Sequence, residues 1–544
     1  MKYIVVTGGV ISGIGKGITS CSIGVLFKAL GYTVTMIKID PYLNVDAGTM
    51  SPYEHGECFV LSDGGECDLD LGNYERFLRT ELTRDHNITT GRIYQSVIEK
   101  ERRGDYLGAT VQIVPHITDE IISHISNVSV LPVGERTPDI CIIEIGGTVG
   151  DIEGLPFIEA LQQMRGVTED EFCFVHVAMA VNVPELKTKP IQHSIAALRS
   201  RGIFPDLLVV RSKEKLEEEV KSKLHRLCQI SPHDIISNPD VPTIYHVSEV
   251  FSQQRICQRI GRVIGITTTP LICDGPHSDI VAYYDKQTSL KEVNIGIVGK
   301  YTGSPDTYLS LVRAIEHASF HLNVRTNVTW ISSDHEDMAS KTFDNLSRCD
   351  GFIIPGGFGS RGIPGKLAVA RFARENNIPI LGICLGMQVM IVDSLKYIGL
   401  HATSREWDDL PCDETTRFAI DLLPGQTNTK GGTMRLGNYI TTLTSQTLRD
   451  MYKSENVIER HRHRYEVNNS FIQDINLSGL HISGQTPCGS PPANAGIGTD
   501  SNNLVEIIEL KDHPFYIGCQ FHPEFRSYPD KPHPLFVGLL RTCI

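Results

Sequence analysis

The sequence lacks the features of a disulfide-stapled or membrane-spanning protein. Its fourteen cysteines are scattered with no C-x-x-C pair, so we expect free thiols in a reducing compartment. No apolar run approaches the roughly 20 residues that a membrane-spanning helix needs. The first residues lead straight into a strand and a glycine turn, so we also expect no signal peptide. These absences together predict a cytoplasmic protein.

Basic residues are in the minority. The chain has 51 Lys and Arg against 64 Asp and Glu, which gives a formal net charge of −13. This charge argues against general binding to nucleic acid or to an anionic membrane, but small anionic ligands could still occupy local basic pockets. Apolar material is ample, because 41% of the 544 residues are hydrophobic. The length corresponds to about three to four ordinary domains, or to two large α/β domains.

The first chemical motif is a glycine-rich loop at residues 8–17. A β-branched run at residues 2–7 predicts a buried parallel strand, and a helical pattern follows the loop to about residue 30. Backbone N–H groups at the start of such a helix bind phosphate oxygens, and Lys16 adds a positive charge. The match to a P-loop is imperfect, because Gly17 stands where a metal-binding Ser or Thr is expected. The alternative is a plain glycine turn of a dinucleotide-binding or other βα loop.

Acidic residues follow other predicted strands of the first half. A strand at residues 34–39 carries Lys38 near its carboxyl end, where ligands of open α/β sheets bind. Residues 40–57 are too polar and too broken by Gly and Pro for a regular element, and such long loops usually carry function. A strand at residues 140–145 contains Glu144. Without a loop hydroxyl, Mg²⁺ needs carboxylates such as Asp70 and Glu144, although each acid alone could be a helix cap or a surface group.

The pattern of strands and helices continues to about residue 265. Strands are predicted at residues 172–178 and 206–211, a polar loop at 187–192 precedes a helix to about residue 201, and a charged helix is expected at 213–227. Alternating elements of this kind predict a doubly wound domain with a parallel sheet. Residues 266–291 are expected to be a linker with a helical piece near 280–284, and a second α/β domain is expected over 292–544.

The second half contains a candidate nucleophile. An apolar run of strand length at residues 378–383 stops at Cys384, which is flanked by Gly382 and Gly386, and a helical pattern follows. Such a strand–turn–helix arrangement is a nucleophile elbow, where only small neighbours fit. The positive end of the helix dipole would lower the pKa of the thiol. The alternative is a buried, inert cysteine in a parallel strand.

Two further features of the same domain favour a nucleophile. The strand and glycine turn at residues 351–359 could offer free backbone N–H groups as an oxyanion hole. Near the C-terminus another strand ends in His522, and Glu524 follows two residues later. An early Cys with a late His and Glu supplies a nucleophile, a base and a group that orients the base. His522 alone could equally be a surface or core histidine.

Long motifs throughout the chain resemble the CTP synthase family in its eukaryotic form, which joins an N-terminal amidoligase domain to a C-terminal class I glutamine amidotransferase domain. The resemblance rests on these segments and covers nearly the whole chain: residues 8–17, 40–46, 48–57, 68–77, 100–108, 144–153, 187–190, 351–359, 378–388, 431–437, 459–468 and 517–525. It implies the domains 1–265 (synthetase), 266–291 (linker) and 292–544 (glutamine amidotransferase). Both domains would be doubly wound α/β folds, the first with a P-loop-like parallel sheet.

The family resemblance also implies two nucleotide sites in the first domain. The ATP site would use Gly13, Ile14, Gly15, Lys16, Gly17, Lys38, Asp70, Arg211 and Asp240, with Mg²⁺ on Asp70 and Glu144. The UTP site, which the feedback inhibitor CTP would share in part, would use Ser12, His55, Gly147, Asp151, Ile152, Glu153, Lys187, Thr188, Lys189, Gln192 and Lys223.

In the second domain, the resemblance implies that Cys384 attacks glutamine, His522 moves the proton and Glu524 orients His522. Glutamine would be bound by Gly356, Phe358, Leu385, Gln388, Glu406 and Arg464, with the oxyanion held near Gly356 and Leu385. Some positions depart from the family pattern. Pro364 replaces an acid in the loop linked to activation by GTP, and Cys58 and Cys67 stand in the loop associated with the ammonia path. Residues 484–503, rich in Gly, Pro, Ser and Asn, are expected to be a disordered insertion.

The implied reaction is the ATP-dependent amination of UTP to CTP with ammonia from L-glutamine, through a 4-phosphorylated UTP. GTP would activate the enzyme, CTP would inhibit it, and the chain would form tetramers that can assemble into filaments. Nucleic acid and membranes are not expected partners. One alternative is another ATP-dependent amidoligase with the same two modules, such as a cobyrinate-type amidase, which lacks the motif at residues 187–190. A second alternative is a silent, filament-forming nucleotide sensor, which the two complete sets of site residues disfavour.

Overall fold

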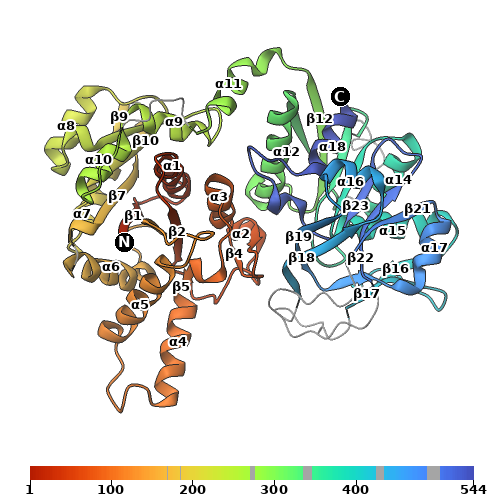
Figure 1. Ribbon diagram of the computed structural model, residues 1–544, viewed down its shortest axis with the longest axis horizontal. Coiled ribbons are helices and arrows are strands. Elements are labelled where there is room, and N and C mark those ends of the chain that lie inside the picture. The colour runs from red at the N-terminus through yellow and green to blue at the C-terminus, as the bar shows by residue number, and fades with distance from the viewer. Residues whose placement is uncertain are drawn as a thin grey trace. The chain divides into compact units, whose positions relative to one another are not determined.

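The computed structural model describes residues 1–167, 169–183, 185–269, 276–334, 346–407, 409–423, 434–486 and 503–544. The chain forms two compact units (Figure 1), one of Met1–Ala47 with Asn73–Asp285 and one of Gly48–Gly72 with Lys286–Ile544. No helix within the described ranges is long and apolar enough to cross a membrane. The expected insertion at residues 484–503 lies largely outside the described residues.

A parallel sheet forms the centre of the first unit. Seven strands of the described chain hydrogen-bond in the order β11-β10-β7-β1-β6-β2-β5. Every neighbouring pair is parallel. The strands are β1 (Lys2–Gly8), β2 (Val34–Asp40), β5 (Asn87–Thr89), β6 (Ile140–Ile145), β7 (Phe172–Met179), β10 (Leu207–Ser212) and β11 (Ile235–Pro239). Strands β1, β2 and β6 are buried along most of their length, as the β-branched runs predict for strands that are covered on both faces.

Helices connect these strands and bury their apolar faces against the sheet. Helix α1 (Lys16–Ala29) packs on β1, β2 and β6, and α5 (Thr118–Ser129) packs against α6 (Leu155–Val167). The other helices of this unit are α4 (Thr90–Arg103), α7 (Lys189–Arg199), α8 (Glu218–Cys228), α9 (His246–Gln253), α10 (Ile256–Val263) and α11 (Ser278–Lys286). A short hairpin, β8 (Val181–Val183) with β9 (Glu185–Lys187), precedes α7. This alternation is the doubly wound architecture that the sequence predicts.

The second unit has a larger, mixed sheet. Nine strands of its described part have the order β13-β12-β14-β15-β23-β22-β21-β18-β19, parallel from β13 to β23 and antiparallel beyond. They are β12 (Glu292–Gly299), β13 (Arg325–Ser332), β14 (Gly351–Ile354), β15 (Ile380–Ile383), β18 (Arg435–Leu443), β19 (Asn456–His463), β21 (Leu480–Gln485), β22 (Val505–Leu510) and β23 (Tyr516–Cys519). A small sheet of β16 (Ala402–Ser404), β17 (Arg417–Leu422) and β20 (Tyr465–Val467) accompanies it.

Two hydrophobic clusters make up the core of the second unit. The helices of this unit are α12 (Leu309–Leu322), α14 (Ile363–Asn376), α15 (Leu385–Tyr397), α16 (Gln446–Tyr452), α17 (Ile472–Leu477) and α18 (Pro534–Cys543). Its early segment contributes α2 (Pro52–His55) and a hairpin of β3 (Cys58–Val60) with β4 (Glu66–Asp68), and α3 (Leu69–Leu78) follows. Helix α15 is buried along most of its length and contacts β15 and β23, so the turn before it is held firmly.

Three local predictions were wrong. Residues 40–57 contain the short helix α2 (Pro52–His55), whose first residue is a proline in a favoured position. Lys187 ends a strand, and α7 begins at Lys189, inside the expected polar loop, again with a proline in its first turn. The charged helix expected from residue 213 begins only at Glu218. Prolines at helix starts explain two of these differences, because proline is compatible with the first turn.

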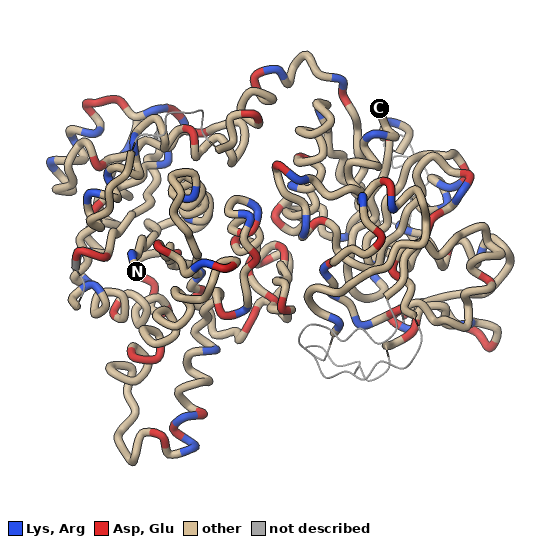
Figure 2. Tube along the Cα trace, viewed as in Figure 1, with Lys and Arg blue, Asp and Glu red and all other residues tan. Residues whose placement is uncertain are grey.

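Charged residues of both signs are distributed through each unit (Figure 2). Figure 2 shows charged residues of both signs along α4 and along α8, rather than a continuous basic stripe. This mixture agrees with a formal net charge of −13 and fits small anionic ligands in local sites better than an extended polyanion.

Candidate functional site

The turn at Cys384 has the geometry of a nucleophile elbow. Strand β15 ends at Ile383 and α15 begins at Leu385, so Cys384 alone forms the connection. Its backbone has φ +53° and ψ −104°, a conformation that non-glycine residues rarely adopt. A Cβ added to Gly386 would lie 2.1 Å from the Ile354 carbonyl oxygen, so this position accepts only glycine. The strain places the thiol at the end of a parallel strand, facing the start of a helix.

His522 and Glu524 lie beside this thiol. His522 Nδ1 and Glu524 Oε1 are 2.7 Å apart, and both side chains are largely buried. Burial acts to lower the pKa of His522, but the charges of Glu524 and Cys384 outweigh it and raise that pKa to about 10. This electrostatic balance favours the imidazolium form of His522 beside the sulfur of Cys384. Such a pair can attack an amide carbon and then protonate the leaving nitrogen.

The glycine turn after β14 lies against the same pair. A Cβ on Gly356 would lie 2.7 Å from His522 Cε1 and 3.6 Å from the Cβ of Cys384, so the backbone approaches the pair closely. The Gly359 N–H donates to Glu406 Oε1 at 2.9 Å. Burial raises the pKa of Glu406, while that hydrogen bond and the charges of Lys300 and Arg464 oppose the rise. The structure therefore brings Gly356, Glu406 and Cys384 into one site.

The remaining residues expected to bind glutamine are close by. Gln388 lies on α15 and donates from Nε2 to the Tyr465 carbonyl and to Gln520 Oε1, each at 3.1 Å. Its own Oε1 is buried and has no hydrogen-bond partner within the described chain, so it is able to accept a hydrogen bond. Phe358 is partly exposed, with the guanidinium of Arg462 5.0 Å from its ring centroid.

The structure adds Gln520, which the sequence analysis did not single out. Gln520 is fully buried in the segment between β23 and His522, and its Nε2 lies 3.6 Å from Cys384 Sγ. An amide N–H at this distance can stabilise a thiolate. The only sequence signal was its place within the motif at residues 517–525. Lys300, directly after β12, and Lys366, near the start of α14, were missed as well, because a lone lysine gives no signal in the sequence.

In the first unit, the glycine-rich loop leads from β1 into α1. Gly13 and Gly15 have φ values of +70° and +87°, and Lys16, the first residue of α1, donates from Nζ to the Gly147 carbonyl at 2.6 Å. This contact brings the loop and the segment after β6 to the same carboxyl edge of the sheet, where ligands bind in such folds. Gly17 follows Lys16 in the first turn of α1.

A cluster of charges lies beside this loop. Lys38 Nζ is 3.5 Å from Asp40 Oδ1 and 3.6 Å from Glu144 Oε1. The Tyr74 hydroxyl hydrogen-bonds to Glu144. Buried carboxylate oxygens of this kind are the ligands that Mg²⁺ prefers. No cluster of three or more possible metal ligands occurs within the described ranges. Asp70 lies in the first turn of α3 and belongs to the second compact unit.

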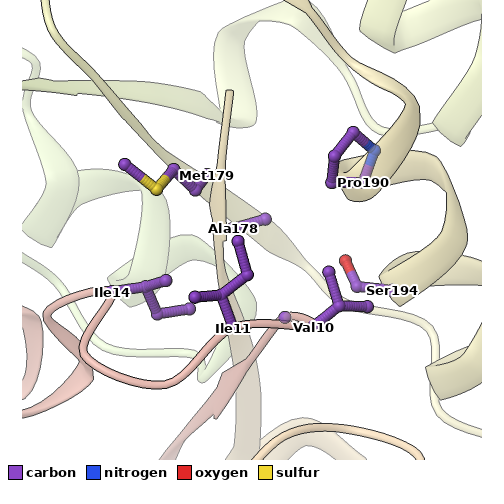
Figure 3. Close-up of a pocket in the computed structure, with 8 residues that line it drawn as sticks. Val10, Ile11, Ile14, Ala178, Met179, Pro190 and Ser194 are labelled. Carbon is purple, nitrogen blue, oxygen red and sulfur yellow. The ribbon is translucent and has the colours of Figure 1, made fainter. Parts of the chain in front are cut away.

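A small apolar hollow adjoins the glycine loop (Figure 3). It encloses about 200 Å³, part of which is open solvent. The lining residues come from the loop, the end of β7 and the start of α7: Gly9, Val10, Ile11, Ile14, Ala178, Met179, Pro190 and Ser194. Only Ile14 was among the expected binding residues, although the others adjoin the motifs that the sequence analysis identified. The hollow therefore lies between the predicted phosphate loop and the segment that starts at Lys187.

The other expected nucleotide residues have these positions. Gly147 has φ +71°, and Asp151 Oδ2 accepts the Thr148 N–H at 3.0 Å. Gln192 Nε2 donates to Thr188 Oγ1 at 3.0 Å, and Arg211 Nη2 lies 2.8 Å from Asp240 Oδ1. The remaining residues that were expected to bind nucleotides are exposed at the surface of their units. They are Ser12, Ile152, Glu153, Lys187, Lys189 and Lys223 in the first unit, and His55 at the end of α2 in the second.

Comparison with known proteins shows the family to which this chain is similar. A family model described as CTP synthase N-terminus matches residues 2–266, and one for class I glutamine amidotransferases matches residues 304–542. Proteins named CTP synthase are 48% identical in Natronomonas pharaonis and 47% identical in Methanothermobacter thermautotrophicus. Each alignment covers 100% of this chain and 95% or 98% of the relative. A solved glutaminase domain of Trypanosoma brucei CTPS with bound acivicin is 35% identical and covers 46% of this chain and 93% of its own, with a TM-score of 0.40.

A synthetase part and a class I amidotransferase part in one chain define a ligase that takes its nitrogen from glutamine. More narrowly, the chain belongs to the CTP synthase family, because relatives at 46–48% identity match it over essentially its full length. It converts UTP to CTP with glutamine as the nitrogen donor, a step of pyrimidine nucleotide synthesis that consumes ATP. These relatives are archaeal, so they support the family but do not test the expected eukaryotic subtype.

Proposed function

We propose that Cys384, His522 and Glu524 are the glutaminase centre of this enzyme. Cys384 Sγ attacks the side-chain amide carbon of glutamine, and the carbonyl oxygen gains charge next to the N–H groups of Gly356 and Leu385. His522 gives its proton to the leaving nitrogen, which departs as ammonia and leaves a thioester. Water, deprotonated by His522, then hydrolyses the thioester to glutamate. The strained backbone of Cys384 beside the buried His522–Glu524 pair carries this proposal.

The carboxyl edge of the first sheet is proposed as the site where UTP is activated. The uracil O4 attacks the γ-phosphorus of ATP and ADP leaves, so that O4 becomes part of a good leaving group. Ammonia then adds at C4 and inorganic phosphate departs, which yields CTP. Lys16 and the loop N–H groups neutralise phosphate charge, and Lys38 lies beside them. Mg²⁺ would supply further neutralisation, with Glu144 and phosphate oxygens as its ligands in this unit.

Regulation and assembly are proposed from the family resemblance. GTP would activate glutamine hydrolysis, CTP would compete for the UTP site, and the chain would form a tetramer capable of filament growth. Pro364 in the first turn of α14 stands in the segment linked to GTP.

The boundaries 1–265, 266–291 and 292–544 remain our proposal for the functional domains. No disulfide joins the cysteines that the structure describes, which supports a reducing, cytoplasmic location.

One experiment tests the proposed centre. Purified enzyme is supplied with UTP, ATP and Mg²⁺ and with either glutamine or ammonia, with and without GTP, and CTP is followed by absorbance. Treatment with a thiol alkylator should abolish the glutamine-dependent reaction and spare the ammonia-dependent one, with mass spectrometry locating the label on Cys384. Glutamine hydrolysis that persists after complete labelling of Cys384 would refute the assignment.

A further inference from the structure

Two buried lysines lie beneath the glycine turn that follows β14. Lys366 is fully buried in the first turns of α14, and Lys300 is almost fully buried directly after β12. A Cβ added to Gly357 would lie 3.5 Å from Lys300 Cε and 3.9 Å from Lys366 Nζ. The opposite side of the turn contacts His522 through Gly356. The turn is therefore enclosed between the proposed catalytic pair and the two lysines.

Each lysine hydrogen-bonds to one carbonyl of the turn. Lys366 Nζ donates to the Pro355 carbonyl at 3.3 Å, and Lys300 Nζ donates to the Phe358 carbonyl. The C=O and N–H of a trans peptide point in opposite directions. A lysine that holds the carbonyl therefore aims the following N–H away from itself. The Phe358–Gly359 peptide shows this effect, because the Gly359 N–H points to Glu406 Oε1 at 2.9 Å.

We propose that Lys366 and Lys300 are positioning residues for glutamine hydrolysis. Lys366 holds the Pro355–Gly356 peptide so that the Gly356 N–H faces the carbonyl oxygen of glutamine, and Lys300 holds the Phe358–Gly359 peptide so that Gly359 fixes Glu406. This inference rests on the proposed glutaminase centre. Neither lysine touches the reacting atoms; each acts through the orientation of a peptide plane.

The energetic setting of Lys366 agrees with this role. Within the described residues, both amines are satisfied by backbone carbonyls, Lys366 by that of Pro355 and Lys300 by that of Phe358, rather than by an ion pair. The groups that act on Lys366 are Lys300, Cys384, Glu406 and Asp334; burial and the charge of Lys300 lower its pKa to about 7. A buried lysine without an ion pair usually costs stability, whereas a neutral amine still donates an N–H to a carbonyl. The presence of a buried lysine at position 366 is thus better explained by its orientation of the turn than by a contribution to the stability of the fold.

The test replaces Lys366 in the full-length enzyme, in order to separate a role in orienting the turn from a role in stabilising the fold. Lys366→Met keeps the aliphatic length and removes the donor, Lys366→Gln keeps an uncharged N–H donor, and Lys396→Met is the control, because Lys396 lies on the exposed side of α15. Four quantities are measured: kcat and KM for glutamine hydrolysis, the rate of Cys384 alkylation by iodoacetamide, the ammonia-dependent rate of CTP formation, and the thermal midpoint.

For Lys366→Met we expect kcat to fall about tenfold or more, because an oxyanion donor is misaligned. KM, alkylation and ammonia-dependent synthesis should stay within about threefold of wild type, and the midpoint should not fall, since a buried amine is replaced by an apolar side chain. Lys366→Gln should recover part of kcat, and Lys396→Met should behave as wild type. An unchanged kcat in Lys366→Met, or an equal loss of the alkylation rate, would overturn the inference. Glutamine hydrolysis by wild type with Cys384 fully alkylated would instead overturn the proposed centre.

Discussion

Replacing Glu524 with glutamine removes one charge from the proposed catalytic pair and little else. Glu524 Oε1 lies 2.7 Å from His522 Nδ1, and Gln has nearly the same shape as Glu. The carboxylate, ahead of Cys384, is the largest of the influences that raise the pKa of His522 against the lowering effect of burial. Without it, the imidazolium loses its main partner, and an amide can also hold the ring in the wrong tautomer.

The structure sets the size of the effect. A His522 pKa of about 10, against its ordinary 6.5, corresponds to roughly three and a half powers of ten in protonation, or about 5 kcal/mol. If Glu524 supplies about half or more of this stabilisation, Glu524→Gln lowers the glutaminase kcat by roughly 10² to 10³-fold, within the range known for an orienting carboxylate. The pKa of His522 should fall below 10.

The assay compares two reactions of the same preparation. Glutamine hydrolysis is measured across pH, and the His522 resonance is followed by NMR. CTP formation from free ammonia reports the integrity of the synthetase site and should be unchanged. A Glu524→Gln enzyme with wild-type glutaminase activity, or with a His522 pKa still near 10, would show that this carboxylate does not govern the imidazole.

Three further outcomes are expected. Lys16→Ala should stop CTP formation from either nitrogen source while glutamine hydrolysis persists, and normal CTP output would exclude Lys16 from the phosphate site. Glu66→Gln should lower the free energy of unfolding by about 1–3 kcal/mol, because it leaves Arg462 in a partly buried pair without its anion. Glu455→Gln in an exposed pair should cost about 0–1 kcal/mol, and similar values for both variants would contradict this. Burial lowers the pKa of Lys366, so between about pH 7 and 10.5 the unfolded chain binds more protons than the native one, and this lysine makes stability rise with pH. Chemical denaturation curves of Lys366→Met should lack that rise. The same pH dependence in the variant and the wild type would contradict the titration of a buried Lys366.

The order of elements was predictable from the sequence because buried parallel strands are long β-branched or apolar runs. Strand β6 has the predicted bounds, and the single-residue turn at Cys384 follows from the glycines on either side. The bounds of α7 and α8 were less predictable, since a proline starts one helix earlier than its polar residues suggest and the other starts five residues later. The mixed character of the second sheet was also not predicted, because antiparallel strands give no signal beyond alternation.

The chemical residues of the site were predictable where the residue type itself implies the chemistry, as with Cys384 and His522. The residues that contact and position these groups were not predictable. Gln520 and Lys366 act through contacts made only by the folded chain: an amide 3.6 Å from Sγ, and an amine 3.3 Å from a carbonyl. Nothing in a single sequence indicates that these side chains point inward. Segment Gly48–Gly72 shows the same limit, because its place in the second compact unit depends on tertiary contacts such as Arg462 with Glu66.

The central claim is that glutamine hydrolysis and CTP formation use separate residues of one chain, with Cys384 required for the first alone. The most direct measurement is the rate of CTP formation by Cys384→Ala enzyme with UTP, ATP and Mg²⁺, supplied with either glutamine or ammonia. We predict no CTP from glutamine and a rate from ammonia equal to that of wild type. Loss of both activities in a folded Cys384→Ala enzyme, or retention of the glutamine-dependent rate, would contradict the account.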